Sequence, residues 1–186
     1  MRIITGAAKG RRLVAPDTPD TRPATDRVRE AVFSALGTWV VDADVLDLYA
    51  GSGSYGLEAL SRGAASATFV ESGRAALEAL RANIAAVGLG GSVVATTVEA
   101  FLERPGTRRY HLVFIDPPWD LPTEVVDRQL AQIDAILHDD GEVVVSRRAG
   151  DVPPQPPAGW ELAADRRYGD ARIYRYVKLS DEDDRG

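Results

Sequence analysis

Cysteine is absent from the 186-residue chain, and histidine occurs only as His111 and His138. The missing cysteines exclude disulfides and thiolate metal sites, and two histidines give no indication of a metal site. No apolar run approaches the roughly 20 residues that cross a bilayer. The N-terminus also lacks the continuous apolar segment of a signal peptide. We therefore expect a soluble cytoplasmic protein that needs no metal and contacts no membrane.

Acidic residues outnumber basic ones, and the net charge of −6 is no overall signature of nucleic-acid binding. The charges are unevenly distributed, however. From Arg2 to Arg29 there are seven basic residues and three acids. Because exposed charges are screened over about 10 Å, this basic segment can bind a polyanion although the chain as a whole is acidic.

The composition, with 45% apolar and 27% charged residues, is typical of a single globular domain. We expect a basic hairpin and arm over residues 1–25, the main domain over residues 26–179 and an acidic, disordered tail over residues 180–186. A helix is expected to begin at Thr25 or Asp26. Either residue is a good N-cap, and apolar residues recur after it at the helical period.

Strands and helices alternate from Asp44 onward. Strands are predicted over residues 45–50, 66–72, 92–98, 110–116 and 141–148, and helices over residues 54–63, 74–88 and 123–137. Residues 159–179 are predicted to form two strands joined by a turn near Gly169. Because strands that follow helices pair in parallel, the pattern predicts an α/β fold with a Rossmann-like, doubly wound, mostly parallel seven-stranded sheet and a C-terminal antiparallel hairpin.

The segment "DLYAGSGSYGLEAL" contains G-x-G-x-x-G at Gly51, Gly53 and Gly56, between a predicted strand and a predicted helix. Glycines allow a sharp turn and a close approach of the backbone to a ligand at the carboxyl end of the sheet. Glu71 follows Gly51 by 20 residues, at the end of the next strand. A carboxylate there is suited to accept hydrogen bonds from ribose hydroxyls.

Two classes of nucleoside cofactor fit this glycine corner. A dinucleotide would place its pyrophosphate on the helix N-terminus, whereas S-adenosylmethionine presents a cationic amino-acid end. Asp47, four residues before Gly51, supplies a negative charge suited to that cationic end, directly or through water. The alternative is a structural turn in which Asp47 is a local cap and Glu71 a solvated strand end.

The segment "LVFIDPPW" ends a buried strand with an acid, two prolines and a tryptophan, at the same edge of the predicted sheet. An exocyclic amine of a nucleobase is a poor nucleophile, and the Asp116 carboxylate and Pro117 carbonyl are two acceptors that can orient its N–H groups. Prolines preorganise these acceptors, and Trp119 offers a ring for base stacking. The alternative is an Asp-Pro-Pro turn with Trp119 covering the core.

Together, "DLYAGSG", Glu71 and "DPPW" resemble the class I S-adenosylmethionine-dependent methyltransferases that act on amino groups. More narrowly, "MRIITGAAKGRRL", "TRPATDRVREAVFSAL", "LDLYAGSGSYGLEALSRGA" and "LVFIDPPW" are similar to the RsmD-type 16S rRNA guanine-N2 methyltransferases. The similarity runs from about Arg2 to Val145 and is weak over the last forty residues.

The resemblance implies that S-adenosylmethionine is the cofactor, leaving as S-adenosylhomocysteine, and that 16S rRNA is the partner, in a small ribosomal subunit or an assembly intermediate. It assigns the target-base site to Asp116, Pro117, Pro118 and Trp119. The implied cofactor-binding residues are Asp47, Gly51, Ser52, Gly53, Glu71, Thr97 and Val98. The implied RNA-binding residues are Lys9, Arg11, Arg12, Arg22, Arg27 and Arg29.

One position departs from the family pattern. The family tends to have an acid after the third strand, where this chain has Thr97, so the adenine contact is expected from the Thr97 hydroxyl or the Val98 backbone. Four other functions stay open: an adenine-N6 DNA methyltransferase, a protein-glutamine methyltransferase, an NAD-dependent oxidoreductase, and a non-catalytic RNA-binding or ribosome-assembly module that retains cofactor affinity. A monomer is the default expectation.

Overall fold

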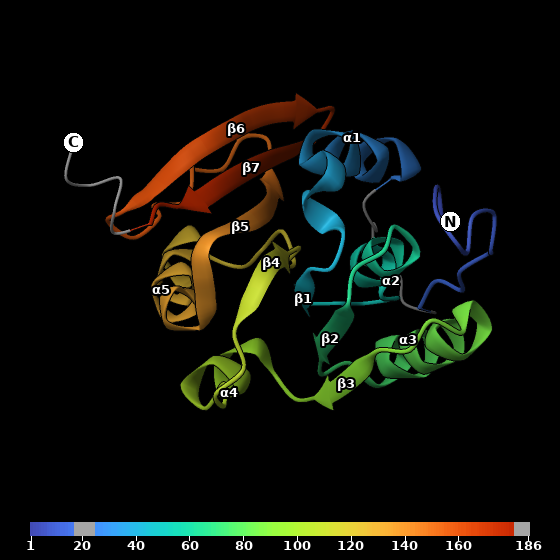
Figure 1. Cartoon of the computed structure of the whole chain (residues 1–186). Helices are drawn as coiled ribbons and strands as arrows, with labels where there is room; N and C mark the ends of the chain where they lie inside the picture. Colours follow the sequence, from blue (N-terminus) through green and yellow to red (C-terminus); the bar gives the residue numbers. More distant parts are fainter. Residues whose placement is uncertain (17–24, 181–186) are drawn as a thin grey trace. The chain divides into compact units, whose positions relative to one another are not determined.

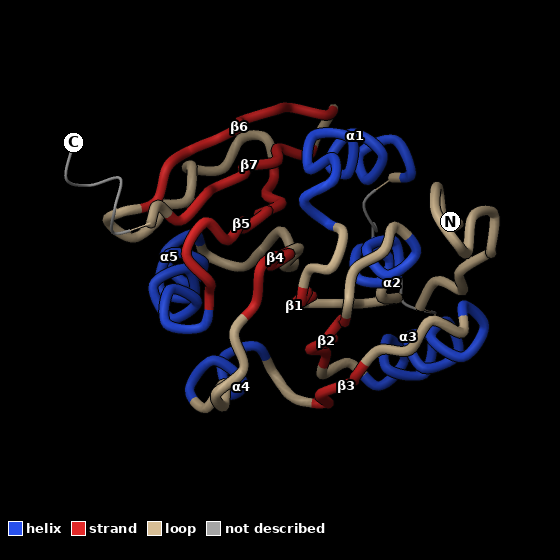
Figure 2. Tube along the Cα trace, in the orientation of Figure 1, coloured by secondary structure: helices blue, strands red, loops and turns tan. Residues whose placement is uncertain are grey.

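The computed structural model describes residues 1–16 and 25–180, so Arg22 and the acidic end of the chain lie outside the described part. Its contacts divide the chain into two compact units, Met1–Val98 and Glu99–Gly186. The strands form a seven-stranded sheet in the order β3-β2-β1-β4-β5-β7-β6. The predicted seven-stranded, mostly parallel sheet with a C-terminal antiparallel hairpin is confirmed (Figures 1 and 2).

The first unit begins with the predicted N-terminal hairpin, which is reduced to one antiparallel bridge between Arg2 and Arg12. Its regular elements are α1 (Asp26–Leu36), the 3-10 helix η1 (Gly37–Val40), β1 (Asp44–Leu48), α2 (Ser54–Ser61), β2 (Ser66–Glu71), α3 (Arg74–Val87) and β3 (Ser92–Ala95). Strands β1 and β3 both pair in parallel with β2. Helix α1 begins as predicted, because the Thr25 side chain accepts a hydrogen bond from the Val28 N–H at 3.3 Å.

The second unit contains the rest of the sheet. Its elements are β4 (Tyr110–Ile115), α5 (Thr123–Ile133), η2 (Asp134–Ile136), β5 (Leu137–Arg148), β6 (Trp160–Tyr168) and β7 (Ala171–Lys178). Strand β5 pairs in parallel with β4 and antiparallel with β7, which is joined to β6 by a tight turn. Burial explains the apolar run of β4, in which Leu112, Val113, Phe114 and Ile115 are each at most 1% exposed.

The largest differences from the predicted boundaries lie at the end of β3 and between α5 and β5. Strand β3 ends at Ala95, and a short helix, α4 (Val98–Glu103), follows it. The β-branched residues around Thr97 favour a longer strand, but Val98, Phe101 and Leu102 are buried at helical spacing. Helix α5 stops at Ile133, and β5 begins at Leu137, four residues earlier than predicted.

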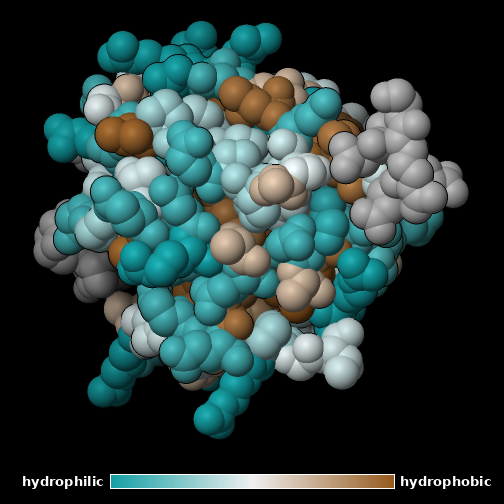
Figure 3. All heavy atoms as spheres, turned by 90° about the vertical axis from the view of Figure 1, so that its left-hand side faces the viewer, coloured by the Kyte–Doolittle hydropathy of each residue, from teal (hydrophilic) through white to brown (hydrophobic). Residues whose placement is uncertain are grey.

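The face drawn in Figure 3 is predominantly hydrophilic, with apolar side chains scattered over it. The exposed large apolar residues are Val14, Trp39, Val41, Leu89, Val152 and Leu162. Among the described residues, none of the helices has the length and apolar character that spanning a membrane requires.

Candidate functional site

The glycine loop, residues 49–53, connects β1 to α2 in the first unit. Gly53 is the N-cap of α2 and has a left-handed conformation, with φ 80°. A Cβ at this position would lie 2.5 Å from Leu80 Cδ1 and would be strained at this φ, so packing and backbone both favour glycine. At Gly51, where φ is 56°, a Cβ would meet nothing closer than the Tyr49 carbonyl oxygen at 3.9 Å. The loop is therefore packed on the core at Gly53 and open to an approaching ligand at Gly51.

Tyr49 is the strained residue of this loop. Its φ of 58° is unusual for a residue with a side chain. Backbone strain of this kind costs on the order of 1–3 kcal/mol and concentrates at ligand-binding loops. Nothing in the sequence singles out Tyr49, because aromatic residues after a strand are usually packing residues.

Asp47 lies on β1 beneath the glycine loop and is 1% exposed. Its Oδ2 accepts a hydrogen bond from the Gly56 N–H at 2.9 Å. A Cβ on Gly56 would come within 3.2 Å of this oxygen and 2.4 Å of the Phe69 ring. The carboxylate thus satisfies a backbone donor in the first turn of α2, where a negative charge is favourable.

Glu71 joins the end of β2 to the glycine loop. Its Oε2 accepts a hydrogen bond from the Gly51 N–H at 2.8 Å. Its Oε1 accepts hydrogen bonds from the backbone N–H groups of Ser72 and Gly73 at 2.8 and 2.7 Å. An ionised carboxylate has about four acceptor positions, so Oε2 retains capacity for one further donor.

Asn83, on α3, is a residue of this site that sequence reasoning missed. It is 1% exposed, and its Nδ2 donates to the carbonyl oxygens of Ser52 and Val14, each at 2.9 Å. Its Oδ1 accepts from the Val14 N–H at 2.8 Å. One side chain therefore holds the basic arm and the glycine loop together. The signal that could have indicated it is its position on the apolar face of α3, in helical spacing with Ala76, Leu80 and Val87.

Thr97 and Val98 follow β3. Thr97 is exposed, whereas Val98 is 2% exposed as the first residue of α4. The Thr96 N–H donates to the Glu71 carbonyl oxygen at 3.0 Å, which places the end of β3 beside Glu71. The predicted adenine-contacting residues thus neighbour the predicted ribose-contacting residue.

The DPPW loop, residues 116–119, follows β4 in the second unit. Asp116 is half-buried, and burial raises its pKa to about 6, while a hydrogen bond from the Ser146 side chain works in the opposite direction. Ser146 is 7% exposed and follows Val145, the residue of β5 that pairs with Ile115. Parallel pairing of β4 and β5 therefore places a hydroxyl donor beside the carboxylate.

The other DPPW residues differ in exposure. Pro117 is buried, Pro118 is exposed, and the half-buried Trp119 has the Arg148 guanidinium over its ring, with Cζ 5.9 Å from the centroid. The Leu121 N–H donates to the Pro118 carbonyl at 3.0 Å, which closes a turn. The loop thus presents one acidic acceptor and one aromatic face on a constrained backbone.

Arg147 is a second residue that sequence reasoning missed. It is 2% exposed, and its Nη2 donates to the Leu121 carbonyl at 2.7 Å and lies 3.0 Å from Asp151 Oδ2. Arg147 therefore fixes the chain that leaves the DPPW loop. The sequence shows only an arginine pair, Arg147 and Arg148, at the end of a strand.

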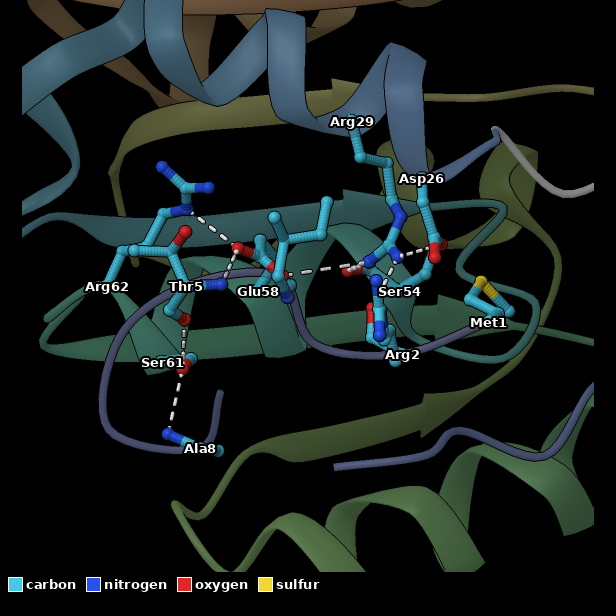
Figure 4. A network of polar contacts seen from close by, with 12 residues as sticks. Met1, Arg2, Thr5, Ala8, Asp26, Arg29, Ser54, Glu58, Ser61 and Arg62 are labelled. Atoms are coloured by element: carbon cyan, nitrogen blue, oxygen red, sulfur yellow. Dashed lines mark hydrogen bonds and ion pairs between the residues drawn. The ribbon is translucent and has the colours of Figure 1, made fainter. Parts of the chain in front are cut away.

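The structure corrects the prediction for Arg29, which is fully buried and not an RNA-facing residue. Its guanidinium donates to the Arg2 carbonyl at 2.6 Å and the Ser54 carbonyl at 3.1 Å, and pairs with Asp26 at 2.7 Å. It also lies 3.8 Å from the buried carboxylate of Glu58 (Figure 4). Arg29 thus packs α1 against the arm and α2.

Glu58 completes this polar network beneath the arm. Its two oxygens accept hydrogen bonds from the backbone N–H groups of Ile4 and Thr5, at 2.7 and 3.1 Å, and from Arg62 Nε at 2.7 Å (Figure 4). The basic arm is therefore anchored by a buried carboxylate of α2. Nothing in the sequence pattern distinguishes Glu58 from a solvated helix residue.

The other predicted RNA-binding residues within the described part of the chain are all exposed: Lys9, Arg11, Arg12 and Arg27. Arg11 also donates from Nη1 to the Ala86 carbonyl at 3.0 Å. Arg22 lies outside the described residues. Across residues 1–16 and 25–180, no group of three or more His, Cys, Asp and Glu side chains could hold a metal ion.

Comparisons of this chain with family models, with known sequences and with solved structures agree with one another. Residues 1–177 match the family model described as conserved hypothetical protein 95. The chain is 39% identical to the ribosomal RNA small subunit methyltransferase D of Escherichia coli K12, over 98% of this chain and 93% of that protein. The solved yhhF protein of Escherichia coli has a TM-score of 0.86 and 36% identity, covering 97% of this chain and 98% of that chain. A solved hypothetical protein of Thermus thermophilus has a TM-score of 0.82 and 30% identity, covering 96% and 99%.

Proposed function

We propose a specific reaction for this chain, which belongs to the RsmD family, the family described as conserved hypothetical protein 95. The reaction is transfer of a methyl group from S-adenosylmethionine to the exocyclic N2 amine of a guanosine in small-subunit (16S) ribosomal RNA. The observation that carries this proposal is the environment of Asp116. A half-buried carboxylate with a raised pKa, next to two prolines and an aromatic ring, suits an amine acceptor.

The cofactor is assigned to the first unit, on Asp47, Gly51, Ser52, Gly53, Glu71, Thr97 and Val98. The open space at Gly51 and the remaining acceptor capacity of Glu71 Oε2 support this assignment. S-adenosylmethionine supplies a methyl group on a positively charged sulfur. Glu71 would accept a ribose hydroxyl, and Asp47 would favour the cationic end of the cofactor from beneath the loop.

The target amine is assigned to the DPPW loop. The Asp116 carboxylate accepts one amine N–H, Pro117 offers a carbonyl acceptor for the other, and Trp119 stacks against the base. As the carbon–sulfur bond breaks and the carbon–nitrogen bond forms, the amine nitrogen loses a proton to Asp116 or to water. With a pKa of about 6, Asp116 is mostly ionised at pH 7 and is still a better base than an ordinary aspartate.

The test is transfer of labelled methyl to small ribosomal subunits that lack the modification, in parallel with naked rRNA and duplex DNA. Nuclease digestion then identifies the labelled nucleoside. Recovery of N2-methylguanosine is the expected result. Label recovered on adenine in DNA would instead identify the protein as an adenine-N6 DNA methyltransferase.

Two further observations, one from this assay and one from a separate assay with NAD, would contradict the proposal. Cofactor binding without methyl transfer to any of the three substrates would indicate a non-catalytic RNA-binding module. Oxidation of a substrate by NAD would identify a dehydrogenase. An Asp116→Asn variant is the matched control, because it keeps the shape of the side chain and removes its negative charge.

A further inference from the structure

We propose a second RNA-binding surface, separate from the basic arm, formed by Arg148, Arg166 and Tyr168 where β5, β6 and β7 meet the hairpin turn. This hairpin-end surface would contact the phosphates on either side of the target nucleotide. The inference rests on the proposed function, because it supplies the RNA backbone contacts that extrusion of a base to the DPPW loop requires.

The strand register places these residues on one face. Ser146 pairs with Ile173, which pairs with Arg166. Side chains of directly paired residues point to the same face of a sheet. Arg166 therefore shares a face with Ser146, the residue that hydrogen-bonds Asp116, about 10 Å away across two strand spacings.

The next row of the same face repeats the arrangement. Arg148 pairs with Ala171, which pairs with Tyr168. Arg148 follows Ser146 by two residues, and Tyr168 follows Arg166 by two. Because alternate residues of a strand point to the same face, Arg148 and Tyr168 share the face of Ser146, the hydrogen-bond partner of Asp116. Two cations and one aromatic ring thus extend outward from the DPPW loop over the β6–β7 pair, which forms one edge of the sheet.

The charges of this region are only partly neutralised. Arg172 makes two hydrogen bonds of 2.6 Å to the Asp165 carboxylate, and Arg147 is paired with Asp151. Arg148 and Arg166 are exposed, and no carboxylate among residues 1–16 and 25–180 lies within ion-pair distance of either. In a chain with a net charge of −6, two exposed arginines beside a base-stacking residue fit a phosphate backbone, which arginine binds through paired donors.

Arg148 connects this surface to the base site. Its guanidinium lies over the Trp119 ring, on which the target base is proposed to stack. A cation at that ring is within one nucleotide's reach of the base, so Arg148 is placed to hold an adjacent phosphate. Arg166, one strand spacing beyond β7, is placed to hold the next one.

The test compares two double variants in an Asp116→Asn background. Arg148→Gln with Arg166→Gln removes the proposed contacts. Arg104→Gln with Arg128→Gln is the control, because it removes the same charge from two exposed residues of the same unit. Arg104 directly follows α4, and Arg128 lies in α5. Fluorescence anisotropy would measure binding of a small-subunit rRNA fragment as a function of salt, and calorimetry would verify unchanged cofactor affinity.

We expect the first double variant to bind RNA about tenfold or more weakly than the control at 0.1 M salt, with a salt slope smaller by about 1.5. Equal affinity and salt slope in the two double variants would overturn the inference. Competition by polyglutamate as strong as that by unlabelled RNA would also overturn it, because it would indicate an acidic protein partner. Because binding is measured without turnover, a failure of the proposed methyl transfer would be seen separately, in the wild-type assay.

Discussion

Ser146 and Asp116, thirty residues apart in the chain, are joined by a side-chain hydrogen bond at the ends of two neighbouring parallel strands. The hydroxyl stabilises the ionised carboxylate, whereas burial destabilises it, and burial is the larger influence. The result is a carboxyl group whose pKa of about 6 lies close to physiological pH. Ser146 is thus a positioning residue for the proposed amine acceptor.

This pairing predicts the pH dependence of activity. Only the ionised Asp116 can take up the amine proton, so kcat/KM should fall as pH drops through about 6. Ser146→Ala removes the interaction that favours the ionised form, which raises the pKa of Asp116 and moves this limb to higher pH. Pre-steady-state and steady-state rates between pH 5 and 8.5 would measure the shift. Ser92→Ala, at an exposed serine, should leave the limb in place, and an unmoved limb in Ser146→Ala would contradict the role.

The same raised pKa predicts a cost in stability. Between the unfolded pKa near 4 and the folded pKa of about 6, the folded protein binds more protons than the unfolded chain. Stability contributed by Asp116 is therefore present at low pH and lost as pH rises through this window. Asp116→Asn should raise the free energy of unfolding at pH 7 by on the order of 1–3 kcal/mol, while methyl transfer falls sharply. Urea titrations at pH 4 and pH 7 would test it; a gain that is as large at pH 4 as at pH 7 would rule out this explanation.

Glu71 offers a prediction for the cofactor half of the site. Glu71→Ala removes the acceptor of the Gly51 N–H and the proposed acceptor of the ribose, so the dissociation constant for S-adenosylmethionine should rise by about tenfold or more. Glu71→Gln retains one carbonyl oxygen and should lose less. Isothermal titration calorimetry would measure both, with the exposed Glu78→Ala as control. An affinity equal to that of the control would remove Glu71 from the cofactor site.

Arg29 should behave as a structural residue. Arg29→Ala leaves Glu58 buried with less compensating charge and removes two donors to backbone carbonyls, so unfolding should become easier by about 3–5 kcal/mol. Arg27→Ala, outside this buried network, should change stability by less than about 0.5 kcal/mol. Differential scanning calorimetry would separate the two. Weaker RNA binding by Arg29→Ala with unchanged stability would instead identify Arg29 as an RNA-binding residue.

The sequence by itself determined the fold class and the location of both loops. Apolar runs of buried strands, helical spacing and the glycine and proline positions are local signals, and each acts within a few residues. They predicted the strand–helix alternation, the Thr25 cap, the glycine loop after β1 and the DPPW loop after β4. The short α4 was missed, because β-branched propensity at Thr97 competes with burial, and burial is decided by packing.

Only the tertiary structure decided which polar side chains belong to the interior. Arg29, Glu58 and Arg147 are indistinguishable in the sequence from solvated residues, yet each is at most 2% exposed, as is Asn83. Their partners include groups 25 to 69 residues away along the chain, many of them backbone groups that the fold brings close. A buried charge or amide is stable only when such partners are in place. Its role is therefore set by the packing of distant segments, which no local pattern encodes.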